Sequence, residues 1–151
     1  MLQPGTTAPP IPLADIDTGE ERAEPWVEGP TVVGFFKVTC PVCQMAAPAV
    51  EALAEGGALV VAVGEDPPKK LNHYRVEFGQ DVATRSEPPP YPVSTAYGVE
   101  SVPTLFLVGI DGVIVDAVAG WNRDRWNSLA ERAGARPVSS PDDGLPPFRP
   151  G

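Results

Sequence analysis

The sequence has only two cysteines and one histidine among its 151 residues. So few cysteines exclude the disulfide-rich scaffold of a small secreted protein. A tetrahedral zinc site needs four ligands, which Cys40, Cys43 and His73 do not supply. We therefore expect no metal and no cofactor; a zinc site shared between two chains is the alternative. His73 lies in a polar stretch and is expected at the surface.

Basic residues are also scarce, since 11 Lys and Arg stand against 20 Asp and Glu, for a net charge of -9. Nucleic acids and anionic membranes require clustered Lys and Arg, and no such cluster is visible in the sequence. The apolar runs at residues 58–63 and 105–110 fall far short of the roughly 20 residues that cross a bilayer. We expect no nucleic-acid partner and no membrane span.

The first residues lack the features of a secretory signal. The first basic residue is Arg22, and four prolines interrupt residues 1–14, so neither the charged start nor the apolar centre of a signal peptide is present. This predicts a cytoplasmic protein, with an exported protein whose signal has been removed as the alternative. We expect the chain to act as a monomer.

The length fits one domain, which we assign to residues 1–134. Within it, residues 1–30 alternate turn residues with isolated apolar ones and are expected to form an irregular or hairpin-like lead-in. Residues 135–151 contain five prolines and little periodicity, which predicts a proline-rich tail that need not order alone. Asp142 and Asp143 in this tail are expected to be solvated charges.

Hydrophobic periodicity predicts an α/β protein. Buried strands are expected at residues 31–38, 58–63 and 104–108, a short one at 81–84, and a hairpin at Asp111-Gly112 that returns as strand 113–118. Helices are expected at 41–55, 66–79, 94–97 and 122–134, with Asn122 as N-cap of the last. Leu71, Tyr74, Val76 and Phe78 are the expected anchors of the second helix, and Trp26, Trp121 and Trp126 are expected in the core rather than in a substrate groove.

Cys40 and Cys43 stand where the first strand gives way to the first helix. Residues three apart on a helix have Cβ atoms about 5 to 6 Å apart, so the pair can form a disulfide with little movement. A helix N-terminus stabilises a thiolate. We therefore predict that Cys40 attacks a substrate disulfide and that Cys43 resolves the mixed disulfide. A pair of inert buried thiols is the alternative.

Several further motifs accompany the pair: Pro48 five residues after Cys43, Tyr97-Gly98, Val102-Pro103-Thr104, Gly112, Gly120, and the lead-in Gly5-Thr6-Thr7-Ala8-Pro9. Together they resemble the thioredoxin superfamily, in its redoxin or TlpA-like branch. The resemblance implies a thioredoxin-like fold with a central mixed β-sheet flanked by helices. It implies a thiol-disulfide oxidoreductase, acting as a reductase, whose partners are a disulfide-containing protein or small molecule and a redox donor. It also implies a cis Val102-Pro103 peptide that faces the cysteines, so Val102 and Pro103 are predicted substrate contacts.

Two positions depart from the family pattern. Thr39 stands where the family often has Trp, and Gly34 stands where thioredoxin has the buried acid that helps to deprotonate the second thiol. Lys37 is expected to reach solvent rather than to stabilise the Cys40 thiolate. A peroxiredoxin-like thiol peroxidase is disfavoured because Lys37 replaces the Thr or Ser of those enzymes. A noncatalytic thioredoxin-fold binding module is the other alternative.

Overall fold

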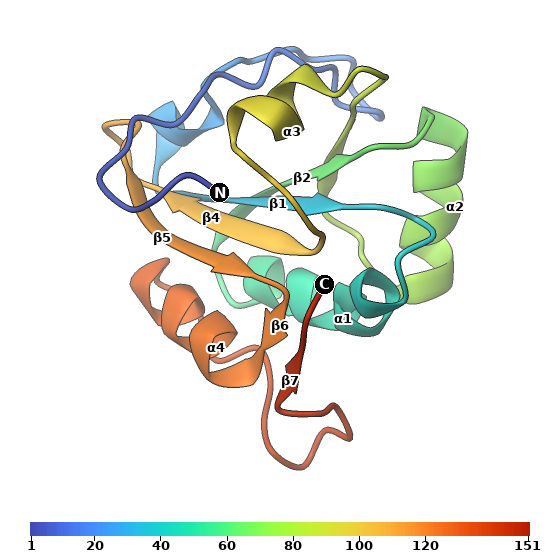
Figure 1. Cartoon of the computed structure of the whole chain (residues 1–151), viewed down its shortest axis with the longest axis vertical. Coiled ribbons are helices and arrows are strands. Elements are labelled where there is room, and N and C mark those ends of the chain that lie inside the picture. Colours follow the sequence, from blue (N-terminus) through green and yellow to red (C-terminus); the bar gives the residue numbers. More distant parts are fainter.

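Five strands form one mixed sheet in the computed structural model, which describes residues 1–151 (Figure 1). They are β1 (Thr31–Phe36), β2 (Leu59–Gly64), β3 (Ala83–Ser86), β4 (Thr104–Val108) and β5 (Ile114–Ala119), in the order β3-β2-β1-β4-β5. β1 and β2 pair in parallel, as do β2 and β3, whereas β4 is antiparallel to both β1 and β5. The expected central mixed sheet flanked by helices is confirmed.

The helices begin and end where local chemistry favours it. They are the 3-10 helix η1 (Pro25–Glu28) and the α-helices α1 (Pro41–Glu55), α2 (Pro68–Phe78), α3 (Pro92–Ala96) and α4 (Arg123–Arg132). Proline suits the first helical position because its missing N–H has no helical partner there. Gly79 ends α2 in the left-handed conformation, and the side chain of Asn122 caps α4 by accepting from the N–H of Arg125 (3.0 Å). The predicted helices are thus confirmed.

Two apolar layers lie on opposite faces of the sheet. Side chains alternate along a strand, so Val32 and Phe36 of β1 contact the layer of α1, α2 and α4, whereas Val33 and Phe35 contact α3 and the lead-in. Figure 1 shows the lead-in and α3 together above the sheet and α1 and α4 below it. All three tryptophans are buried in these layers, as expected: Trp121 and Trp126 in the first and Trp26 in the second.

Two sequence expectations are wrong in detail. Val76 is 82% exposed rather than an anchor of α2, because it lies on the opposite side of the helix from the buried Leu71 and Tyr74. The third strand begins at Ala83 instead of residue 81. Its position is set by pairing with β2, from Val61 opposite Ala83 to Gly64 opposite Ser86, which the residues themselves do not encode.

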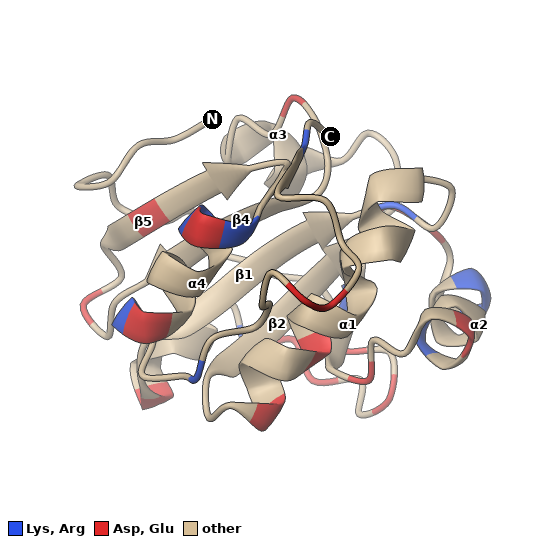
Figure 2. Ribbon diagram, turned by 90° about the horizontal axis from the view of Figure 1, so that it is seen from below, with Lys and Arg blue, Asp and Glu red and all other residues tan.

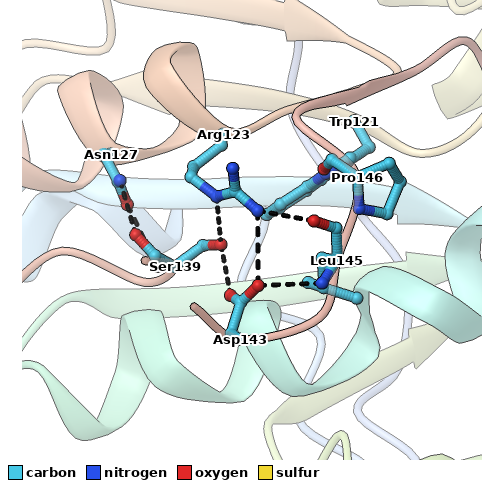
Figure 3. A network of polar contacts seen from close by, with 7 residues as sticks. All are labelled: Trp121, Arg123, Asn127, Ser139, Asp143, Leu145 and Pro146. Carbon is cyan, nitrogen blue, oxygen red and sulfur yellow. Dashed lines mark hydrogen bonds and ion pairs between the residues drawn. The ribbon is translucent and has the colours of Figure 1, made fainter. Parts of the chain in front are cut away.

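The segment after α4 packs against the domain through the side chain of Arg123 (Figure 3). This guanidinium, 8% exposed, donates to the hydroxyl of Ser139 (2.9 Å), a carboxylate oxygen of Asp143 (3.3 Å) and the carbonyl of Leu145 (2.6 Å). Asp143 is therefore an ion-pair partner, and the expectation of a merely solvated charge is wrong. The domain boundary at residue 134 stays a prediction.

Neighbouring contacts extend this attachment toward the end of the segment. Asn127 donates to the carbonyl of Ser139 (2.8 Å), and the indole N–H of Trp121 donates to the carbonyl of Pro146 (2.7 Å). Further along, β7 (Phe148–Arg149) pairs antiparallel with β6 (Trp121–Asn122). Residues 135–151 thus follow a defined path along α4 and β6.

Charges of both signs are interspersed on α2 and α4. The ribbons of α2 and α4 each carry basic and acidic residues side by side, with no extended basic stretch (Figure 2). None of the helices combines the length and the apolar composition needed to cross a membrane.

Candidate redox site

Cys40 is the N-cap residue of α1. It has an extended backbone (φ -83°, ψ 115°), and its sulfur accepts a hydrogen bond from the N–H of Cys43 (3.2 Å). Both cysteines are free; Cys40 is half-buried, whereas Cys43 is 3% exposed. The sulfur of the less buried cysteine therefore lies at the positive end of the helix dipole, where a thiolate is stabilised.

The loop before β4 lies directly against this cysteine. The thiol of Cys40 donates to the carbonyl oxygen of Val102 at 3.4 Å, and the Val102-Pro103 peptide is cis, as the resemblance predicted. The hydroxyl of Thr104 donates to the carbonyl of Ser101 (2.7 Å), which fixes the loop. The structure thus brings Cys40, Cys43, Val102 and Pro103 together at one site.

Burial raises the pKa of the Cys43 thiol far above its ordinary value, and the hydrogen bond with Cys40 adds to the effect. Cys43 is consequently a neutral thiol at physiological pH, and it must lose a proton before it can act as a nucleophile. Gly34, on β1, has no side chain that could accept this proton. The proton of Cys43 must therefore pass to water or to a group on another element.

The turn between β1 and α1 is held by polar contacts that do not involve the sulfurs. The ammonium of Lys37 pairs with Glu65 (3.3 Å), and this hydrogen bond raises the lysine pKa. The N–H of Val38 donates to Asp66 (3.0 Å), and the side-chain amide of Gln44 donates to the carbonyl of Val38 (2.8 Å). Lys37 thus has a carboxylate partner rather than a thiolate one.

Two hollows flank the dithiol. One, of about 500 Å³, lies between the β1–α1 turn and α2 and is lined in part by Val38, Gln44 and Lys70. The other, of about 180 Å³, lies between Lys37, Glu65 and residues 99–102. Both hollows are solvent-open surfaces next to the site. His73, on the rim of the first, pairs with Glu77 (3.2 Å) and is exposed, as expected.

Sequence reasoning missed two buried polar groups near the cysteines. The hydroxyl of Tyr74 and the amide nitrogen of Gln80 are both buried without a hydrogen-bond partner. Burial raises the pKa of Tyr74, and a thiolate at Cys43 or Cys40 raises it further. Tyr74 had been predicted as an apolar anchor only. Nothing in the local sequence distinguishes Gln80 from a loop residue.

The end of the tail segment is also part of this site, which the sequence did not indicate. Gly151 approaches the carbonyl of Val102 so closely that no side chain fits between them. A Cβ atom on Gly120 would lie 3.1 Å from the carbonyl of Arg149. Residues 149–151 therefore pass across the loop that contacts Cys40.

No protein-family model matches the sequence, and no curated protein matches it in sequence. Similar solved structures include the thioredoxin domain of a thiol-disulfide oxidoreductase from Bacteroides vulgatus, at 18% identity and a TM-score of 0.75, covering 88% of this chain and 99% of that one. A thiol:disulfide interchange protein from a Bacteroides species is 19% identical with a TM-score of 0.73, covering 95% of each chain.

A secreted disulfide oxidoreductase of Mycobacterium tuberculosis is 16% identical with a TM-score of 0.66, covering 80% of this chain and 93% of that one. These neighbours are thiol-disulfide oxidoreductases, and the Cys40–Cys43 pair lies at the junction of β1 and α1 in the same overall architecture. The chain therefore has the fold of the thioredoxin superfamily.

Proposed function

We propose that the protein is a thiol-disulfide oxidoreductase that reduces disulfides of proteins or small molecules, with Cys40 as nucleophile and Cys43 as resolving thiol. The observation that carries this proposal is the placement of the half-buried Cys40 sulfur at the N-cap of α1, in contact with Val102, with buried Cys43 behind it. The fold and its solved neighbours support the same reaction class.

The reaction proceeds in two exchanges. The Cys40 thiolate attacks one sulfur of the substrate disulfide, that bond breaks, and the departing substrate thiolate takes up a proton. Cys43 then loses its proton and attacks the sulfur of Cys40, which releases the second substrate thiolate and leaves a Cys40–Cys43 disulfide. Two electrons have passed to the substrate, and a dithiol donor restores the pair.

Val102 and Pro103 are the proposed substrate contacts. The carbonyl of Val102 already accepts from the Cys40 thiol, so an extended substrate segment beside this loop would present its disulfide to Cys40. A strand pairs through backbone groups, which makes such a contact independent of the substrate's side chains.

A trapping experiment tests the assignment of the two thiols. Reduced Cys43→Ser protein is incubated with oxidised glutathione and, separately, with a protein disulfide, and the products are analysed by intact mass and peptide mapping. We expect a stable mixed disulfide at Cys40, none in Cys40→Ser, and an internal disulfide in the wild type. Failure of Cys43→Ser to trap any adduct at Cys40 would contradict the proposal.

The same proteins separate this function from a thiol peroxidase. We expect slow peroxide consumption by the reduced protein, because Lys37, paired with Glu65, stands near Cys40 in place of a hydroxyl side chain. Rapid consumption that is lost in Cys40→Ser would favour the peroxidase instead.

A further inference from the structure

Cys43, which is itself buried, lines a small cavity. It measures about 10 Å³ and is lined by residues of β1, α1, β2, the α2–β3 connection, β4 and the loop before it. Gly34, Ala46 and Pro103 line it together with Cys43. Apart from the thiol itself, Gln80 brings the only polar side chain to this wall.

Gln80 is held rigidly in place. It follows Gly79, the left-handed residue that ends α2, and its N–H donates to the carbonyl of Arg75 (3.1 Å) while its carbonyl accepts from Val82 (3.1 Å). The residue is 1% exposed, and its side-chain nitrogen has no hydrogen-bond partner. The backbone of Gln80 is therefore fixed beside the cavity, and its buried side-chain nitrogen is free to donate.

A free amide at this place needs an explanation, because a buried polar group without a partner is destabilising. Leucine has a similar volume and would fill the position without that cost. Backbone hydrogen bonds at Lys37 and Cys43 already lower the pKa of this thiol. Among the side chains at the cavity, however, only that of Gln80 carries a further polar group, since Gly34 and Ala46 have none. The thiol of Cys43 is thus the one functional group at the cavity that an amide N–H can serve.

We propose that Gln80 is the positioning residue for the second exchange: its free amide N–H stabilises the Cys43 thiolate through one water held in the cavity that both residues line. The cavity is at the lower limit of the roughly 10 to 15 Å³ that a single water requires. A primary amide suits both states of the thiol, since its nitrogen donates to a thiolate and its oxygen accepts from a thiol. This inference rests on the proposed function.

Gln80 assists the attack of Cys43 on the mixed disulfide. The Cys43 thiol gives its proton to solvent. The resulting thiolate accepts a hydrogen bond from the water that the Gln80 amide orients. The thiolate sulfur attacks the sulfur of Cys40, and the bond between Cys40 and the substrate sulfur breaks. The substrate leaves as a thiolate and takes up a proton, so no further oxidant or reductant is needed.

Burial opposes this ionisation, because it raises the pKa of the Cys43 thiol. A hydrogen bond that exists only with the thiolate counteracts that effect without placing a second charge in the core. Removing it should therefore slow the second exchange and leave the first exchange, which uses Cys40 alone, comparatively fast.

Stopped-flow reaction of the reduced full chain with the disulfide of 5-thio-2-nitrobenzoate resolves the two exchanges. The first release of coloured thiolate depends on reagent concentration and reports attack by Cys40. The second does not depend on it and reports resolution by Cys43. We expect Gln80→Leu to slow the second release by about 10- to 100-fold, the factor of one charge-assisted hydrogen bond, and to move its pH midpoint upward by about one to two units.

Val82→Ala is the matched control, since Val82 is buried in the same connection but does not line the cavity. We expect it to reduce stability and leave the pH midpoint of the second release unchanged. A wild-type rate and midpoint in Gln80→Leu would overturn the inference, as would an equal shift in Val82→Ala. Absence of any Cys40-dependent first release would instead overturn the proposed function.

Discussion

The sulfur of Cys40 lies 3.4 Å from the carbonyl oxygen of Val102, 62 positions later in the chain. This contact joins the start of α1 to the loop before β4, and Gly151 lies against the same carbonyl. Access to Cys40 therefore depends on three segments that are distant in sequence.

Displacement of residues 149–151 should expose Cys40. Because no side chain fits between Gly151 and the Val102 carbonyl, we expect Gly151→Leu to shift this segment away from the loop. Alkylation of Cys40 by iodoacetamide, followed by peptide mass analysis, should become roughly 5- to 30-fold faster. This factor corresponds to a loss of about 1 to 2 kcal/mol in the free energy that holds the segment in place. Arg149→Ala, which alters only an exposed side chain, should leave the rate unchanged. Equal rates in Gly151→Leu and wild type would show that the segment does not cover Cys40.

Replacing Arg123 should detach the segment that follows α4. Arg123→Met retains the length of the side chain but removes its bonds to Ser139, Asp143 and Leu145. We expect the free energy of unfolding in urea to fall by about 2 to 4 kcal/mol, since hydrogen bonds to charged groups contribute about 1.5 to 3 kcal/mol each. Proteolysis after residue 135 should accelerate as well. Arg132→Met, on the exposed side of the same helix, should change stability by less than about 0.5 kcal/mol; similar losses in both variants would refute the anchoring role.

Glu87 stabilises α3 from inside the protein. Its carboxylate is fully buried and accepts from the N–H of Val93 (2.5 Å) and from the N–H and hydroxyl of Ser94. Glu87→Ala leaves these donors unpaired, so we expect the free energy of unfolding to fall by about 3 kcal/mol, with a smaller loss in Glu87→Gln. Glu100→Ala is the exposed control. The role would be contradicted if the melting temperature of Glu87→Ala fell no further than that of Glu100→Ala.

The reduced protein should lose stability at alkaline pH. The folded state raises the pKa of Cys43, so this thiol's contribution is fully present below its ordinary pKa of about 8.5 and is lost as the pH rises above that value. We expect the free energy of unfolding to decline by up to about 1.4 kcal/mol per pH unit there. Burial also raises the pKa values of Tyr74 and Tyr97. These tyrosines add to the decline whether or not Cys43 is a free thiol.

The comparison that isolates the thiol is between the reduced wild type and reduced Cys43→Ser. Both proteins retain the two tyrosines, so the serine variant should show a shallower decline in urea unfolding above pH 8.5. Parallel curves for the two proteins would mean that ionisation of Cys43 does not contribute.

Much of the fold follows from signals within a few residues. The strand Thr104–Val108 has its predicted bounds, Asn122 caps α4, and the Asp111-Gly112 turn joins two antiparallel strands. Each of these features depends on residues that are close by in the sequence, within one helical turn or one hairpin. β3, in contrast, starts at Ala83 rather than at the predicted residue 81. Its start is determined by pairing with β2, more than 20 positions earlier in the chain.

The sequence by itself determined the Cys40–Cys43 pair at a strand-to-helix junction, the Val102-Pro103 motif and the mixed α/β architecture, because spacing and residue type are local properties. The motifs also predicted that Val102 faces the cysteines, whereas only the tertiary structure placed Gln80 beside Cys43 and Asp143 on Arg123. These relationships arise where several elements pack together, and burial there decides whether a polar group has a partner. The surroundings of the two thiols are therefore a property of the fold, whereas the thiols themselves are visible in the chain.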